Sequence, residues 1–142
     1  KLGFVNLNVG VSLKQGYILL SDGQVTDVNG IKVEAIHVPG HTLGHMCYLV
    51  DESILISGDC LAINKNGGYP FFDFFTQFPD MNKKSLVKLR ETLKNKPVKA
   101  VCTGHSGYRE YGQSTFAHID ETAVFDKKIH FDEYAPEDYT KY

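Results

Sequence analysis

The sequence predicts an α+β domain whose mostly antiparallel sheet is covered by one or two helices. Short apolar runs recur between turn residues, which is the pattern of strands rather than of helices. The Asn29-Gly30 pair favours a two-residue hairpin turn. Clear helical periodicity occurs only in residues 82–96. A chain of 142 residues is long enough for a single domain with a substantial core.

The expected strands follow one another along the first sixty residues. Residues 4–20 alternate loosely between apolar and polar side chains, and predict a strand or an extended segment. Residues 24–28 and 31–36 are expected to pair antiparallel through the Asn-Gly turn. Apolar runs at 46–50 and 54–57 predict two more strands, and the second run suits a buried strand.

The second half of the chain predicts one helix and one more strand. Residues 66–75 are rich in glycine and aromatic side chains, and are too irregular for either assignment. The helix over 82–96 has leucines on one face and ends before a proline. Residues 98–102 predict a strand. From 108 to 142 we expect a short helix near 115–126, followed by an extended arm.

Composition excludes several classes of protein. A net charge of -2 without a basic stretch argues against nucleic-acid binding. No run of eighteen apolar residues occurs, so no membrane span is predicted. The first residues have neither an initiator Met nor the apolar core of a signal peptide, and we expect a piece of a longer chain. Cys47, Cys60 and Cys102 are expected to be reduced thiols of a cytoplasmic protein.

Residues 36–45 contain three histidines spaced four residues apart. This spacing would place His37, His41 and His45 on one face of a helix. Pro39 and Gly40 lie between the first two histidines and prevent a helix there. The segment is therefore expected to be a loop between two strands that holds imidazoles in fixed positions.

Three dipeptides share one layout, in which a strand ends, a glycine allows a bend and a metal-binding side chain follows. They are Gly40-His41, Gly58-Asp59 and Gly104-His105. Imidazole and carboxylate groups suit zinc, manganese or iron. Loops that follow strands of one sheet gather at its edge, so we expect the three side chains to converge; alternatively, each is a hydrogen-bonded polar residue at a strand end. Cys60 is left out of the set, because consecutive residues of an extended chain point in opposite directions.

The remaining polar residues of interest are expected to support the structure. His37 is expected to be a hydrogen-bonded structural residue, and His45 either supports the metal ligands or lines the pocket. The hydroxyl of Thr42 is placed to brace the loop. His118 and His130 lie in the C-terminal part without partner motifs, and no functional role is expected for them.

The motifs together resemble the metallo-β-lactamase superfamily. The resemblance rests on His-x-Pro-Gly-His-Thr-x-Gly at residues 37–44, Gly-Asp after an apolar strand, and Gly-His after another. It covers roughly residues 21–107. It implies an αββα sandwich with the metal ions at one edge of its two sheets. It also implies that His41, Asp59 and His105 are metal ligands, with Asp59 bridging two zinc ions (or iron or manganese) and acting in catalysis.

The sequence departs from that family in one respect. The string His-x-His-x-Asp-His, expected upstream of His41, does not occur in the 142 residues, so three of seven ligands are visible. The chain therefore resembles the C-terminal half of such a domain, over residues 1–142. An isolated half would bind metal weakly and have little activity alone. It would also expose an apolar sheet face, and we expect a homo-oligomer through that face or the C-terminal arm.

The function expected from the resemblance is metal-dependent hydrolysis of an ester, a thioester or a similar bond in a small molecule. The branch that it resembles is that of glyoxalase II. The alternative is a truncated, non-catalytic module that associates with itself. A flavo-di-iron redox protein has the same fold, but needs a flavodoxin-like domain that these residues lack. The aromatic residues 69–75 would form a pocket wall or lid, a loop buried against the helix, or an oligomer contact.

Overall fold

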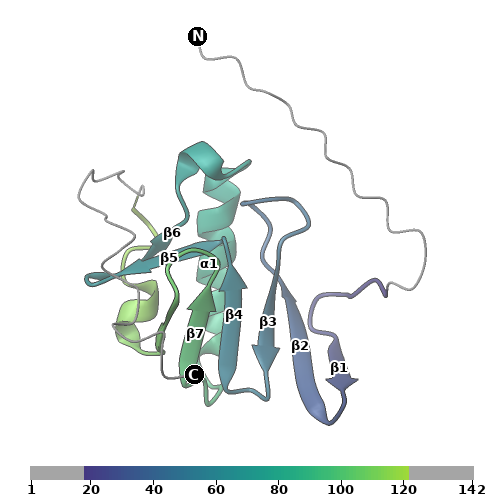
Figure 1. Cartoon of the computed structure of the whole chain (residues 1–142). Helices are drawn as coiled ribbons and strands as arrows, with labels where there is room; N and C mark the ends of the chain where they lie inside the picture. Colours follow the sequence, from purple (N-terminus) through teal and green to yellow (C-terminus); the bar gives the residue numbers. More distant parts are fainter. Residues whose placement is uncertain (1–17, 122–142) are drawn as a thin grey trace, which may run out of the picture.

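The computed structural model describes residues 18–121, which form a six-stranded sheet with one long helix packed behind it (Figure 1). The strand expected over residues 4–20 lies almost entirely outside this range, and so do His130 and the arm beyond residue 121. None of the helices between residues 18 and 121 is long and apolar enough to cross a lipid bilayer.

The main sheet has the strand order β1-β2-β3-β4-β7-β8. All neighbouring strands are antiparallel except β4 and β7, which are parallel. The prediction of a mostly antiparallel sheet is therefore confirmed. The strands of this sheet are β1 (Val25–Val28), β2 (Ile31–His37), β3 (Met46–Val50), β4 (Ile54–Gly58), β7 (Ala100–Thr103) and β8 (Tyr108–Glu110).

The first hairpin forms at the predicted Asn-Gly turn. Asn29 and Gly30 both have positive φ, 55° and 89°, as the tight turn between antiparallel strands requires. The Asp27 carboxylate accepts a hydrogen bond of 2.8 Å from the Gly30 N–H. The turn joins β1 to β2 in the register that pairs Val28 with Ile31.

Helix α1 (Pro79–Leu93) covers one face of the sheet and forms the core with it (Figure 1). Leu86, Leu89 and Leu93 are at most 1% exposed, as their spacing predicts. The helix begins three residues earlier than expected, because Pro79 occupies the first turn, where its missing N–H costs nothing. It also ends earlier, at Leu93 rather than near residue 96.

A second, two-stranded sheet was not expected from the sequence. In the segment judged too irregular for a strand, β6 (Gly67–Pro70) pairs antiparallel with β5 (Leu61–Asn64). Gly68 permits this arrangement, because a Cβ there would lie 1.9 Å from the Thr115 carbonyl oxygen. Two short 3-10 helices complete the described chain, η1 (Asp73–Phe75) and η2 (Gln113–Phe116).

Two further expectations need correction. Strand β8 was missed, and η2 is shorter than the helix expected near 115–126 and begins before it, at Gln113. Strand β4 is not buried on both faces: Leu55 is fully buried, whereas Ile54 and Ile56 are 41% and 43% exposed. The reason is that α1 covers only one face of the sheet, and a strand's side chains alternate between the two faces.

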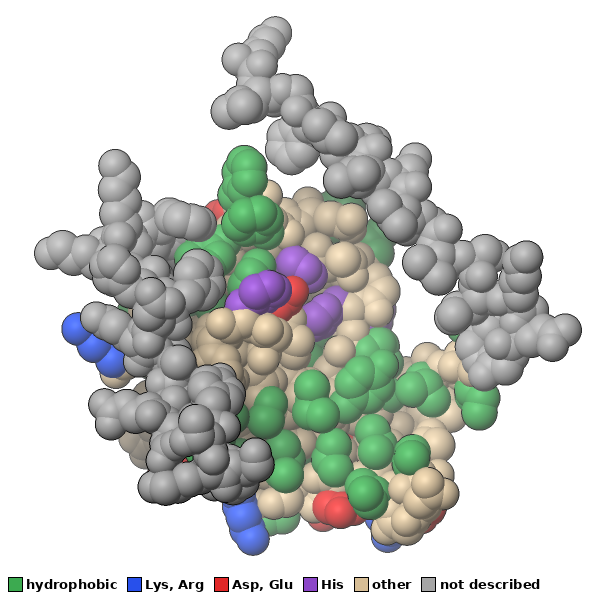
Figure 2. All heavy atoms as spheres, in the orientation of Figure 1, with side chains coloured by type: hydrophobic (Ala, Val, Ile, Leu, Met, Phe, Trp, Pro, Cys, Tyr) green, Lys and Arg blue, Asp and Glu red, His purple; other side chains and the backbone are tan. Residues whose placement is uncertain are grey.

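The opposite face of the sheet is apolar and exposed. Figure 2 shows hydrophobic side chains spread across the strands on this side. Strand register places these residues on one face, because residues paired across neighbouring strands point to the same side. Its most exposed members are Val28, Ile31, Ile54, Ile56 and Tyr108.

Candidate metal centre

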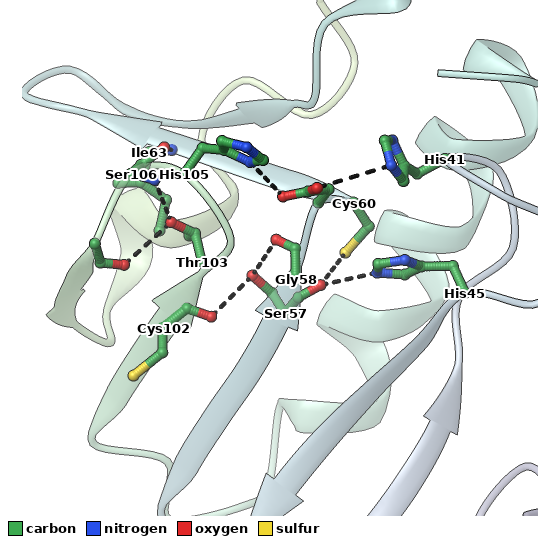
Figure 3. A network of polar contacts seen from close by, with 12 residues as sticks. His41, His45, Ser57, Gly58, Cys60, Ile63, Cys102, Thr103, His105 and Ser106 are labelled. Carbon is green, nitrogen blue, oxygen red and sulfur yellow. Dashed lines mark hydrogen bonds and ion pairs between the residues drawn. The ribbon is translucent and has the colours of Figure 1, made fainter. Parts of the chain in front are cut away.

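Three loops at one edge of the main sheet bring the predicted ligands together. Strands β4 and β7 are parallel neighbours, so the residues that follow them emerge at the same edge. Asp59 follows β4 and His105 follows β7, while His41 comes from the loop between β2 and β3. One Asp59 oxygen lies 2.7 Å from His105 Nδ1, and the other lies 3.8 Å from His41 Nε2 (Figure 3).

The His41 loop is fixed against the start of helix α1. Gly40 has a φ of 143°, and a Cβ there would lie 2.3 Å from the Asn82 backbone, so only glycine fits. The Phe78 N–H donates a hydrogen bond of 2.9 Å to the Gly40 carbonyl. The Ser85 hydroxyl donates one of 2.7 Å to the Pro39 carbonyl. These contacts determine where the His41 imidazole lies.

Glycine is also required beside the carboxylate. The Gly104 N–H donates a hydrogen bond of 3.0 Å to the Gly58 carbonyl, which ties together the loops that follow β7 and β4. A Cβ at Gly104 would lie only 1.9 Å from Asp59 Oδ1. The glycine before His105 therefore leaves the space that the carboxylate occupies.

Gly104→Ala is expected to displace Asp59 and to lower the affinity for zinc by about tenfold or more, as the loss of a group that positions a ligand does. The thermal midpoint should change little, because Gly104 is exposed and its φ lies outside the left-handed region. Zinc titration calorimetry is the measurement. Gly112→Ala is the matched control, because a Cβ there meets nothing within 4 Å. Equal zinc affinity in both variants would show that Gly104 does not position Asp59.

The donor set fits a metal ion. The 3.8 Å between His41 Nε2 and Asp59 Oδ2 is too long for a hydrogen bond, and is a few tenths of an ångström more than the roughly 3.4 Å between two such donors on one tetrahedral zinc ion. Burial lowers the pKa of His41, only partly offset by the Asp59 charge, which favours the neutral imidazole that a metal needs. His41 Nδ1 is buried and has no hydrogen-bond partner among the described residues. Nδ1 of His105 donates to Asp59, so that carboxylate oxygen must give up this hydrogen bond to serve a metal.

An aromatic wall borders the site. The Phe71 ring lies 5.4 Å from both the His41 ring and the His105 ring, measured between centroids. Phe74 and Phe75, in η1, are 73% and 55% exposed. Figure 2 shows histidine side chains around an acidic one, with hydrophobic side chains beside them. The roles of a pocket wall and of a lid both stay predictions.

The other histidines make hydrogen bonds that hold the structure. The His37 ring donates through Nε2 to the Leu43 carbonyl at 2.9 Å, as expected of a structural residue. The His45 ring lies 5.8 Å from that of His41 and donates through Nε2 to a backbone carbonyl of β4. Thr42 braces the loop through its carbonyl, which accepts the N–H groups of Gly40 and His45, and the expected role of its hydroxyl stays a prediction. 

His118 has a role away from the site. It stacks on the Tyr69 ring at 4.5 Å, and its Nδ1 lies 2.8 Å from a Glu121 carboxylate oxygen. The hydrogen bond to Glu121 raises the pKa of His118. These contacts attach the chain after η2 to strand β6.

One cluster was missed by sequence reasoning. The Cys47 and Cys60 sulfur atoms lie 3.6 Å apart beneath the metal centre, and both residues are fully buried. A hydrogen bond from Cys60 lowers the pKa of Cys47 to about 7, against the effect of burial. Burial lowers the pKa of His45, whereas the hydrogen bonds with Cys47 and Ser57 raise it. The net effect is a raised pKa. The two cysteines are thirteen residues apart and share no local motif. Cys47 lies in β3 and Cys60 lies in the turn after β4, so the pairing of these two strands brings them close together.

Imidazole and carboxylate groups that gather at a sheet edge are typical of a metal-binding protein. A family comparison gives the family: the chain belongs to the metallo-beta-lactamase superfamily, whose model matches residues 5–105. A superfamily protein of Sulfolobus tokodaii has a similar structure, with a TM-score of 0.51 and 26% identity over 66% of this chain and 34% of that one. The predicted family is therefore confirmed, and the fold matches that structure over part of its length.

Curated relatives match shorter segments. A lactamase-like protein of Pestalotiopsis fici is 41% identical over 49 residues, 34% of this chain and 16% of that protein. An atrochrysone carboxyl ACP thioesterase of Aspergillus fumigatus is 44% identical over 41 residues, 28% of this chain and 10% of that protein. The match thus spans less than a fifth of the length of these relatives.

Proposed function

We propose that this chain supplies part of the active site of a metal-dependent hydrolase that cleaves an ester, a thioester or a similar bond. The observation that carries the proposal is the convergence of His41, Asp59 and His105 at one sheet edge, with the Asp59 carboxylate between the two imidazoles. Membership of the metallo-beta-lactamase superfamily supports it. Zinc is the proposed metal, because neutral imidazole and carboxylate are its common ligands; iron and manganese are the alternatives.

The proposed roles follow from the positions of the three side chains. Asp59 would hold metal through both oxygens, one directed at each histidine. His41 is kept neutral by burial, and is fixed by the loop that packs on α1. When bound, the metal would lower the pKa of a water molecule so that hydroxide is available near neutral pH.

The substrate that we propose carries an apolar acyl group on a thioester. The aromatic wall of Phe71, Phe74 and Phe75 would bind such a group by burying its apolar surface. The thioesterase named among the relatives supports the type of bond. The proposed resemblance to the glyoxalase II branch, and a cytoplasmic location in keeping with three free cysteines, also belong to this proposal.

The test is to express the chain together with the residues encoded upstream of it, and to measure metal content and hydrolysis of a model acyl thioester. At least two equivalents of metal together with hydrolysis support the proposal. The chain alone is expected to bind metal weakly, because it lacks the His-x-His-x-Asp-His imidazoles. Neither metal nor hydrolysis in the longer protein would favour the alternative, a non-catalytic module that associates with itself.

In that longer protein, Asp59→Asn is expected to lower the rate of hydrolysis by at least about 100-fold, because even the partners of metal ligands contribute up to that factor. An amide cannot bridge two cations as a carboxylate does. Initial rates and bound metal are measured together. Asp120→Asn, the same chemical change at an exposed position, is the control and should leave both unchanged. Unaltered rates in Asp59→Asn would remove this residue from the active site.

A further inference from the structure

Three donor groups beneath the metal centre point to a second site. We propose that Cys47, Cys60 and His45 bind a soft divalent cation, of which Zn²⁺ is the representative, at a site separate from His41, Asp59 and His105. One ligand atom from each of the three residues lies within 4.8 Å of the other two. The Ser57 carbonyl oxygen would supply the fourth donor. Thiolate and imidazole are the ligands that select such ions.

The distances agree with a tetrahedral ion. Two thiolates bound to zinc at about 2.3 Å are roughly 3.8 Å apart, and the Cys47 and Cys60 sulfur atoms are 3.6 Å apart. The Ser57 carbonyl oxygen lies 3.5 Å and 3.2 Å from these sulfur atoms. It lies 2.9 Å from His45 Nε2. The separations between the two sulfur atoms and around the Ser57 oxygen therefore need to change by only a few tenths of an ångström. One His45 ring nitrogen lies within 4.8 Å of both sulfur atoms, and it must approach them to complete the site.

The Ser57 carbonyl oxygen has more hydrogen-bond donors near it than it can accept from, and a bound cation would remove this excess. A carbonyl oxygen has two lone pairs, and His45 Nε2 donates to this one while both thiols also lie within hydrogen-bond distance of it and of each other (Figure 3 shows His45 and Cys60). The two cysteines are fully buried, so water does not supply another acceptor. Binding of a cation would release the two thiol protons to solvent and would require the His45 proton to move from Nε2 to Nδ1. Two thiolates, one imidazole nitrogen and the Ser57 carbonyl oxygen would then surround one cation.

The site is distinct from the proposed catalytic one. Cys60 follows Asp59 directly, but its thiol lies in the core whereas Asp59 lies at the sheet edge. Cys102, the third cysteine, pairs with Ile56 on the opposite face of the sheet and is absent from the cluster. It therefore offers a matched control, since it is a free cysteine in the same fold.

The experiment is a Cd²⁺ titration of the full chain under reducing conditions, followed by the ultraviolet absorption of cadmium-bound thiolates. One equivalent should produce the absorption of two thiolates. Cys47→Ser and Cys60→Ser should lose at least half of it, while Cys102→Ser and Asp59→Asn should keep it in full. Retention in Asp59→Asn separates this site from the proposed catalytic one. No thiolate absorption in the wild type, or loss in Cys102→Ser alone, would overturn the proposal.

A second measurement needs no variant, in case the serine substitutions prevent folding. In the wild-type chain, Zn²⁺ should slow alkylation of Cys47 and Cys60 by at least tenfold, with no change at Cys102, as read by peptide mass spectrometry. Mg²⁺, a hard ion, should have no effect on any of the three. Equal rates with and without Zn²⁺ would overturn the proposal. A Cys47–Cys60 disulfide that persists under reducing conditions would also overturn the proposal, because the two sulfur atoms would then not be available as thiolates.

Discussion

Gly40→Ala is expected to destabilise the fold by about 3 kcal/mol, the combined scale of backbone strain and overpacking. Gly40 has a φ of 143°, which a residue with a Cβ rarely adopts, and the added atom would lie 2.3 Å from both the Cα and the nitrogen of Asn82. These are backbone atoms of α1, so the loop and the helix must separate for the alanine to fit. Separation would break the hydrogen bond from the Phe78 N–H to the Gly40 carbonyl.

Thermal unfolding followed by circular dichroism tests this expectation. For a chain of this size the midpoint should fall by roughly 10 °C. Gly44→Ala is the control in the same loop, because a Cβ there meets nothing within 4 Å and its φ lies outside the left-handed region. Its midpoint should stay within about 2 °C of the wild type. If the two variants melt together, close packing of Gly40 on α1 is not what stabilises the loop.

The loops that carry His41 and Asp59 could be predicted because their geometry is determined locally. Gly40 and Gly58 precede His41 and Asp59 because the chain takes positive φ there, a conformation that favours glycine. Gly104 precedes His105 for a reason that is not local, because the Asp59 carboxylate, which comes from another loop, occupies the space that a Cβ would need. A strand followed by glycine and a polar side chain thus indicates where a loop turns toward the sheet edge.

The features that the sequence did not predict depend on partners far along the chain. Strand β6 forms because Gly68 approaches the η2 backbone closely, and nothing within residues 66–75 encodes that neighbour. The exposure of Ile54 and Ile56 depends on what covers the second face of the sheet, and an apolar run reads the same whether one face or both are covered. The Cys47–Cys60 pair depends on the β3–β4 register in the same way.

The exposed apolar face leads to the other prediction with a large effect. We propose that a second copy of the chain covers this face when the other sheet of the expected αββα sandwich is missing, since no part of residues 18–121 covers it. Ile56 lies between Tyr48 and Cys102 in the register, so its exposed surface is continuous with apolar neighbours on both sides. Burial of such a face against its own copy removes several isoleucine and valine side chains from water, each contributing roughly 1.5–3 kcal/mol when fully buried.

The double variant Ile54→Lys and Ile56→Lys is therefore expected to weaken self-association at least about 100-fold, since four ammonium groups would enter each symmetric interface without partners. Sedimentation velocity over a range of concentrations measures the change. Val25→Lys is the control: Val25 is 58% exposed, but it pairs with Glu34 on the face that carries α1. A wild-type chain that stays monomeric, or equal dissociation in the control, would show that this face does not bind a second copy. If the double variant dissociates and the Val25→Lys variant does not, the two copies are held together by the uncovered face of the sheet and not by exposed apolar residues elsewhere.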